Sequence, residues 1–215
     1  MAIKPILFNT EMVRAILDGR KACTRRILKG AIPFDEKAEY WNVLKKGEWS
    51  GPICVEYFIK QGSPYQPGDI LYVRETWSLR FDGEKYFYKA DKNTSREEKR
   101  LLDYDDVRWH PSIHMPKEAA RIWLKVTDVR VERLQDITPK DAENEGVGNL
   151  FYEDIGYGEK NYGTEVDPEY GIVKEQFAWL WESTIKKSDI DRYGWDANPW
   201  VWVIEFEWCE KPQGV

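Results

Sequence analysis

Long apolar runs are missing from this sequence. None approaches the roughly 20 consecutive residues that a membrane-spanning helix needs. The N-terminal residues 1–5 also lack a signal peptide's hydrophobic core. We therefore expect a cytoplasmic protein without a membrane segment.

Cysteine and histidine are scarce. Cys23, Cys54 and Cys209 are odd in number and far apart, without the short spacing of metal ligands. This usage favours a reducing compartment and disfavours structural zinc. The two histidines, His110 and His114, are spaced i, i+4, but the prolines between and after them disfavour the helix that would direct both at one ion. No metal and no other cofactor is expected.

An excess of positive charge is missing as well. The 215 residues include 32 Lys and Arg against 38 Asp and Glu, a net charge of −6. Non-specific coating of duplex nucleic acid is therefore not expected. The charge is uneven, however, because residues 14–29 hold six basic side chains and one acidic one, whereas 143–169 hold eight acidic and one basic. Such a local basic face can still meet a phosphate.

The length and composition fit one domain. Hydrophobic residues make up 42% of the chain, enough for a substantial core. We expect a single domain over 1–215, with insertions at about 30–66, 91–108 and 146–171 where glycine, proline or charge interrupts the pattern. The first insertion should be loop-rich with a strand near Ile53–Ile59, and the last should be a mobile loop able to close over a site.

Strands outnumber long helices. Alternating apolar or β-branched side chains predict strands near 5–8, 70–77, 84–90, 121–131 and 199–208, with a bulge at Asp128-Val129. Helices are expected at Thr10–Asp18, 138–146 and 174–185. Few helices around this number of strands predict an α+β fold with a closed or nearly closed mixed barrel of about five or six strands.

The most chemically loaded segment is the octet Gly19 to Arg26 (GRKACTRR), directly after the first predicted helix. A desolvated, neutral Lys21 could take the proton of Thr24 and make its hydroxyl a nucleophile. Lys21 and Thr24 could instead bind phosphate together with Arg20, Arg25 and Arg26. A solvated basic turn is the third interpretation.

Two glutamates are candidate partners of that octet. Glu145 ends the helix predicted after Thr138, where the negative helix end would help its carboxyl to hold a proton; an exposed helix-end side chain is the alternative. Glu75 interrupts an apolar strand face, so it is either paired with a cation or part of a site. His114 could face a pocket or be a hydrogen-bonded structural histidine. Of the eleven tryptophans, most should be core, while one or two could stack on a base.

Several of these motifs resemble those of a known protein family. Gly19-Arg20-Lys21-Ala22-Cys23-Thr24-Arg25-Arg26 resembles the G-x-K-x-x-T-x-R signature of ASCH-domain proteins, and Pro67-Gly68-Asp69-Ile70-Leu71 resembles the strand entry that follows it. Stretches around Trp77, His114-Met115-Pro116, 128–136 and 198–206 are similar to the longer, prophage-encoded bacterial branch. The resemblance implies a PUA-like β-barrel with flanking helices and a cleft for RNA or modified nucleosides.

The resemblance also implies roles. In the family's bacterial N4-acetylcytidine amidohydrolases a lysine, a threonine and a glutamate act together, and these match Lys21, Thr24 and Glu145. Those enzymes are about half as long and lack the insertions at 30–66 and 146–171, so the pocket here could be covered, widened or given another task.

Two hypotheses follow. The first is an amidohydrolase that removes an acyl group from the exocyclic amine of a cytidine-like nucleoside. In it Thr24 is the nucleophile, Lys21 the base and Glu145 the acid, and Arg26 or a backbone N–H holds the oxyanion. The second is an RNA or modified-base binding module that binds phosphate through its basic residues. The resemblance adds ribonuclease activity as a variant of this second hypothesis. The candidate substrate-binding residues are Arg20, Arg25, Arg26, Glu75, Trp77 and His114. The oligomeric state does not follow from the sequence.

Overall fold

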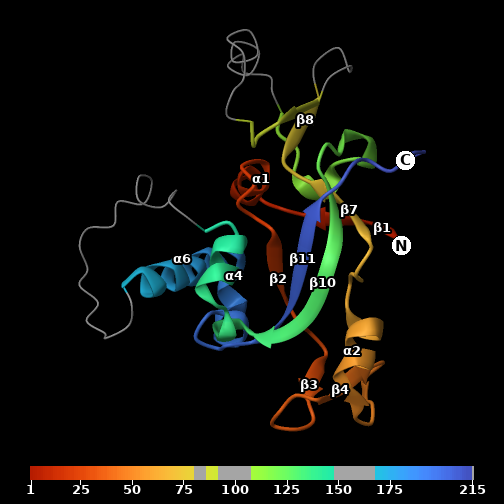
Figure 1. Cartoon of the computed structure of the whole chain (residues 1–215), viewed down its shortest axis with the longest axis vertical. Coiled ribbons are helices and arrows are strands. Elements are labelled where there is room, and N and C mark those ends of the chain that lie inside the picture. Colours follow the sequence, from red (N-terminus) through yellow and green to blue (C-terminus); the bar gives the residue numbers. More distant parts are fainter. Residues whose placement is uncertain (80–85, 92–107, 148–167, 215) are drawn as a thin grey trace.

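The protein is organised around one five-stranded mixed sheet, seen in Figure 1 as the curved strands at the centre. A computed structural model describes residues 1–79, 86–91, 108–147 and 168–214. The sheet consists, in spatial order, of β1 (Ile3–Leu7), β7 (Ile70–Arg74), β10 (Trp123–Arg133), β11 (Trp200–Trp208) and β2 (Cys23–Ile27). β1 and β7 are parallel, and the other neighbours are antiparallel. The predicted α+β class with a mixed sheet is therefore confirmed.

The sheet curls without closing. Its end strands are β1 and β2, and a side chain connects them: Arg26 Nη2 on β2 donates to Leu7 O on β1 at 2.9 Å. The curl follows from β10, whose pairing with β11 shifts register between Val126 and Asp128. The sequence predicts a bulge at this place, and a bulge bends its strand. The three predicted barrel strands all lie in this sheet, but the outer edge of β2 stays open.

Both faces of the sheet are covered. The alternating sequence of β11 predicts one buried face, formed by Trp202, Ile204 and Phe206, and these pack in the larger core with helix α1 (Thr10–Leu17). The opposite face is buried too, because Val201 and Val203 lie under helices α4 (Pro139–Asn144) and α6 (Pro168–Thr184). β11 is therefore a central strand, and helices cover each side of it (Figure 1).

The segment 30–66 is more regular than its breakers predict. It forms β3 (Ala31–Pro33), β4 (Tyr40–Lys45), β5 (Glu48–Trp49), β6 (Ile53–Cys54) and helix α2 (Val55–Gly62). The strand expected over Ile53–Ile59 is thus wrong after Cys54. Val55, Phe58 and Ile59 follow a helical spacing, and Phe58 stacks on the fully buried Trp41 with ring centroids 4.9 Å apart. The segment is thereby anchored to the main core.

The remaining elements are short. They are β8 (Trp77–Leu79), β9 (Tyr86–Tyr88), helix α7 (Ile190–Tyr193) and 3-10 turns at Ser112–His114, Lys117–Ala119, Leu134–Asp136 and Lys187–Asp189. The expected insertions at 91–108 and 146–171 lie largely outside the described residues. Within the described ranges, no helix combines the length and the apolar character needed to cross a membrane.

Candidate functional site

A buried ion pair joins the start of β2 to the end of α4. Lys21 and Glu145 form a single antiparallel β-bridge, and the N–H of Ala22 donates to Asn144 O at 2.7 Å. Lys21 Nζ donates to the Glu145 carboxylate at 2.7 Å and to the Glu145 carbonyl at 2.9 Å. Side-chain exposure is 0% for Lys21 and 3% for Glu145. The alternative of an exposed helix-end Glu145 is therefore excluded.

The close approach of the two segments depends on Gly146. This residue follows Glu145 with φ +91°, and a Cβ there would lie 2.7 Å from the Cβ of Ala15 on α1 and 3.2 Å from that of Lys21. Its carbonyl accepts a 2.7 Å hydrogen bond from Arg20 Nη1. Only glycine combines this backbone conformation with this spacing.

Gly146→Ala is expected to destabilise the protein by about 2–3 kcal/mol, because a strained backbone and a clash coincide. Gly19→Ala is the matched control: Gly19 also has a positive φ, of +72°, but nothing lies within 4 Å of its would-be Cβ. It should cost only about 1 kcal/mol. Urea unfolding of both variants measures the difference, and equal losses would show that the clash at Gly146 is relieved without cost.

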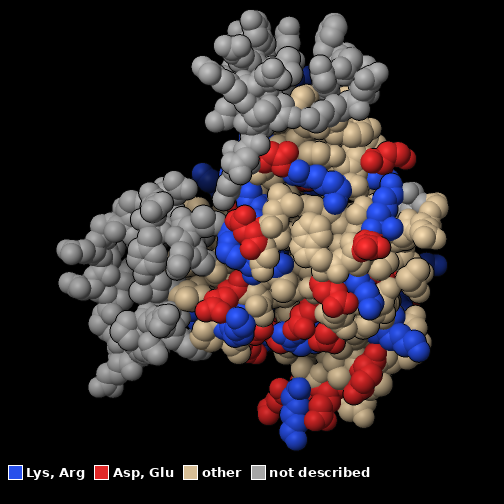
Figure 2. Space-filling view, turned by 45° about the horizontal axis from the view of Figure 1, so that its top comes forward, with Lys and Arg blue, Asp and Glu red and all other residues tan. Residues whose placement is uncertain are grey.

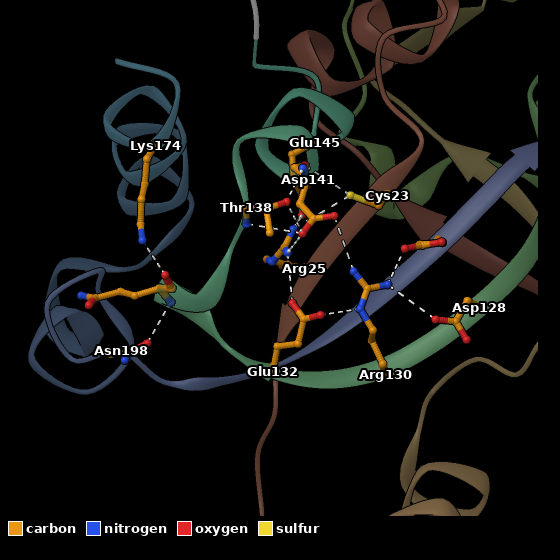
Figure 3. A network of polar contacts seen from close by, with 12 residues as sticks. Cys23, Arg25, Asp128, Arg130, Glu132, Thr138, Asp141, Glu145, Lys174 and Asn198 are labelled. Atoms are coloured by element: carbon orange, nitrogen blue, oxygen red, sulfur yellow. Dashed lines mark hydrogen bonds and ion pairs between the residues drawn. The ribbon is translucent and has the colours of Figure 1, made fainter. Parts of the chain in front are cut away.

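Arg25 connects Glu145 to a wider polar network (Figure 3). Its side chain is 0% exposed and lies 3.3 Å from Glu145, 3.2 Å from Glu132 and 3.6 Å from Asp141. Arg130 continues the network through Glu132, Asp141 and Asp128, and through Glu205 on β11. The guanidinium of Arg25 is thus engaged inside the protein, which argues against the predicted contact with a solvated phosphate.

Cys23 lies between this network and α4. Its thiol is 3.7 Å from the carbonyl of Asp141, and burial, with Glu145 adding to it, raises the pKa of Cys23 far above the ordinary thiol value. A thiol reacts as its thiolate, so Cys23 should be inert.

We expect Ellman's reagent at pH 8 to label the exposed Cys54 rapidly in the native protein and to leave Cys23 unlabelled until the chain is unfolded. The Cys54→Ser variant identifies the rapid phase. Labelling of Cys23 at the rate of Cys54 would contradict the burial of this strand.

Thr24 follows Lys21 by three residues and has a free hydroxyl. The residue is 1% exposed, and among the residues that the structure describes none hydrogen-bonds to its Oγ1, Lys21 included. A small pocket, with a cavity volume of about 20 Å³ and an open mouth, touches Thr24 and Glu145 but not Lys21. Its lining residues are Met12, Thr24, Arg25, Arg26, Glu145, Phe177, Leu180, Trp181 and Thr184. The pocket is thus formed by residues from β2, from α1, from the C-terminal end of α4 and from α6.

Arg26 belongs to the pocket lining, whereas Arg20 does not. Arg26 lines the pocket, and its guanidinium carbon is 5.3 Å from the centre of the Phe8 ring; Lys21 Nζ is 5.6 Å from the same ring. Arg20 is held by the Gly146 carbonyl and by Asp18 at 3.1 Å. Arg26 is the candidate cation that the structure places in the pocket.

Glu75 belongs to a second cluster. It is 1% exposed and accepts two hydrogen bonds from Arg121, at 2.9 and 3.0 Å. Of the two interpretations of Glu75, pairing with a cation is therefore the one observed. Burial raises the pKa of Glu75 although Arg121 opposes the shift. Arg121 also contacts Asp91 at 2.6 Å and stacks 3.9 Å above the Tyr88 ring. Glu75 is not among the residues that line the Thr24 pocket.

Trp77 and His114 also lie outside that pocket. Trp77 stacks on His110 with centroids 4.9 Å apart, and its indole nitrogen is buried without a partner in the described structure. His114 is exposed on a 3-10 turn, where Met115 is the buried residue. Within the described ranges, no group of His, Cys, Asp and Glu side chains could hold a metal ion.

The sequence reasoning missed one wall of the pocket. Phe177, Leu180, Trp181 and Thr184 belong to α6, whose helical stripe signals a buried face but not what it covers. It also missed Glu132 and Asp141, which pair with Arg25, and Arg130, which contacts the same two carboxylates. Alternation of Arg130 and Glu132 along β10 was the available signal, since both project from the same face.

The face shown in Figure 2 carries mixed charge. Figure 2 shows blue and red side chains interspersed over the face that it presents, without a broad area of one sign. This arrangement does not resemble the basic stripe of a protein that coats nucleic acid.

The fold and site define an α+β protein with a buried Lys-Glu pair beside a free threonine hydroxyl. Its structure is similar to one described as "High resolution crystal structure of ASCH domain from Lactobacillus crispatus JV V101", with 12% identity, a TM-score of 0.37, and coverage of 96% of this chain and 79% of that one. No family model matches the chain, and no curated protein matches it either.

Proposed function

We propose that the pocket hydrolyses the amide formed between an acyl group and the exocyclic amine of a cytidine-like nucleoside, as in N4-acetylcytidine. The observation that carries the proposal is the buried Lys21–Glu145 pair next to the unpartnered hydroxyl of Thr24. A base, an acid and a nucleophile from distant parts of the chain are what acyl transfer requires. The resemblance of the Gly19–Arg26 octet to the ASCH signature supports the choice of substrate class.

The first step follows from the pairing of Lys21. Its ammonium already donates to two oxygens of Glu145 and cannot accept a proton in that state. A proton first moves from Nζ to Oε2 along the 2.7 Å hydrogen bond, leaving a neutral amine and a neutral carboxyl.

The neutral amine then takes the proton of Thr24 while Oγ1 attacks the acyl carbon. Arg26, at the pocket, holds the negative oxygen of the tetrahedral intermediate. The bond from carbon to the exocyclic nitrogen breaks, and Lys21 returns a proton to the departing amine. Lys21 then deprotonates a water molecule, which attacks the acyl-threonine ester. Lys21 returns that proton to Oγ1 of Thr24 as the acid leaves. Lys21 and Thr24 are not hydrogen-bonded to each other in the substrate-free protein, so substrate binding must bring Nζ to the hydroxyl.

Incubation with N4-acetylcytidine, followed by chromatography for cytidine and acetate, tests the proposal. Cytidine should form with wild type and not with Thr24→Val, which keeps the shape of the side chain and removes the hydroxyl. Absence of cytidine with wild type at high enzyme concentration would overturn the activity.

The second candidate is an RNA or modified-base binding module. The observation that favours it is the missing Lys21–Thr24 hydrogen bond, because a pair satisfied within the protein can serve to shape a pocket. Salt separates the two functions: binding through phosphates weakens steeply as salt rises, whereas hydrolysis of a neutral nucleoside should change little. The mixed charge of the face shown in Figure 2 favours the nucleoside over a polymer.

A further inference from the structure

Among the described residues, the peptide groups on the outer edge of β2 have no backbone partners. β2 ends the sheet, and its pairing with β11 aligns Thr24 with Ile204. Hydrogen bonds from Leu28 N to Trp200 O and from Phe206 N to Ala22 O fix the even-numbered residues of β2 as those bonded to β11. Because successive peptide groups point to opposite sides of a strand, the N–H and C=O of Arg25 point away from β11.

These groups face the pocket. Thr24, Arg25 and Arg26 all line it. Their side chains alternate between the two faces of the sheet, so a pocket that touches all three lies against the strand edge. Met12 of α1 and the side chains of α6 bound it on either side.

Arg25 is only 3% exposed, yet its peptide N–H and C=O have no hydrogen-bond partner among the described residues. Its side-chain Nε is buried and unpartnered as well. Buried polar groups are nearly always hydrogen-bonded, so such a concentration of unused donors and acceptors indicates a site for a polar ligand.

We infer that the free edge of β2 at Arg25 recognises the nucleobase, with the peptide N–H donating to a ring nitrogen and the neighbouring outward C=O accepting from the exocyclic N–H. The identity of the ligand rests on the proposed function. Cytosine carries an acceptor nitrogen next to an exocyclic amine, and adjacent outward groups of a strand are one donor and one acceptor. This contact would hold the acylated amine beside Thr24, the preceding residue.

The sequence allows the amide group of Arg25 to be observed selectively by NMR. Thr24-Arg25 is the only Thr-Arg pair in the chain, and Arg25-Arg26 is the only Arg-Arg pair. Protein labelled with carbonyl-13C threonine and 15N arginine therefore gives a single carbonyl-correlated resonance, that of the Arg25 amide. Labelling with carbonyl-13C and 15N arginine gives that of Arg26, whose amide points toward β11 and serves as the matched control.

Titration with N4-acetylcytidine and with cytidine should shift the Arg25 amide resonance downfield and slow its hydrogen exchange about tenfold or more, while the Arg26 amide changes little. The 3-deaza analogue of cytidine, which lacks the ring acceptor, should bind about tenfold more weakly than cytidine. Hydrolysis of N4-acetylcytidine without any change at Arg25 would overturn the edge contact and leave the proposed activity intact. A shift at Arg25 by cytidine without hydrolysis would overturn the activity and keep the recognition. If the protein neither binds cytidine nor hydrolyses N4-acetylcytidine, both the edge contact and the proposed activity are overturned.

Discussion

Replacing Lys21 by arginine is expected to lower the rate of N4-acetylcytidine hydrolysis by a factor on the order of a hundred or more. Arginine keeps the positive charge opposite Glu145 but has no accessible neutral form, so it cannot take the proton of Thr24. The measurement is kcat/KM for cytidine release. Lys140→Arg, at an exposed lysine paired with Glu143, is the matched control and should leave the rate unchanged.

A loss of activity could also come from misfolding, because the Lys21 side chain is completely buried. Two readouts separate the causes. Lys21→Arg should retain cooperative unfolding and the cytidine-induced shift at Arg25, and Lys21→Ala should regain part of its activity when a small alkylamine is added to replace the missing base. Full activity of Lys21→Arg would show that the base role is wrong.

Replacing Glu145 by leucine is expected to lower the free energy of unfolding by about 3–5 kcal/mol, because it leaves the buried ammonium of Lys21 without its counter-charge. Arg25 keeps Glu132 and Asp141 as partners, so the main effect should arise at Lys21. The double variant Lys21→Met, Glu145→Leu should lose much less than the sum of the single losses, since no unpaired charge remains.

The exposed pair Lys140–Glu143 provides the control cycle. It joins two exposed side chains 3.1 Å apart, and its coupling should stay below about 1 kcal/mol. Urea unfolding at pH 7 measures all variants. A coupling at Lys21–Glu145 as small as that of the control pair would contradict the burial of the ion pair.

Local patterns in the sequence were enough for most elements. Thr138 caps α4 as expected, and Asp141 completes a capping box with it. The predicted bulge in β10 is also present. The helix predicted over 174–185 is present as α6, which begins earlier, at Pro168. The strand expected at Ile53–Ile59 was wrong because a short apolar run fits a helix as well as a strand, and its contact with Trp41 decided the outcome.

What the sequence alone determined is the set of chemically active residues. Lys21 and Thr24 lie in one octet, and Glu145 ends a helix whose caps can be read from the chain. It also determined the class of fold, because strand periodicity and helix caps are local properties that neighbouring residues encode.

Only the tertiary structure decided which of these residues meet. Glu145 reaches Lys21 across 124 residues because Gly146 lets the end of α4 approach β2. The Arg25 side chain points toward three carboxylates and not toward solvent. The open edge of β2 depends on the same distant contacts, since the sheet order leaves that strand without a second neighbour. Pairings of this kind follow from the packing of elements far apart in the chain, and no local periodicity encodes them.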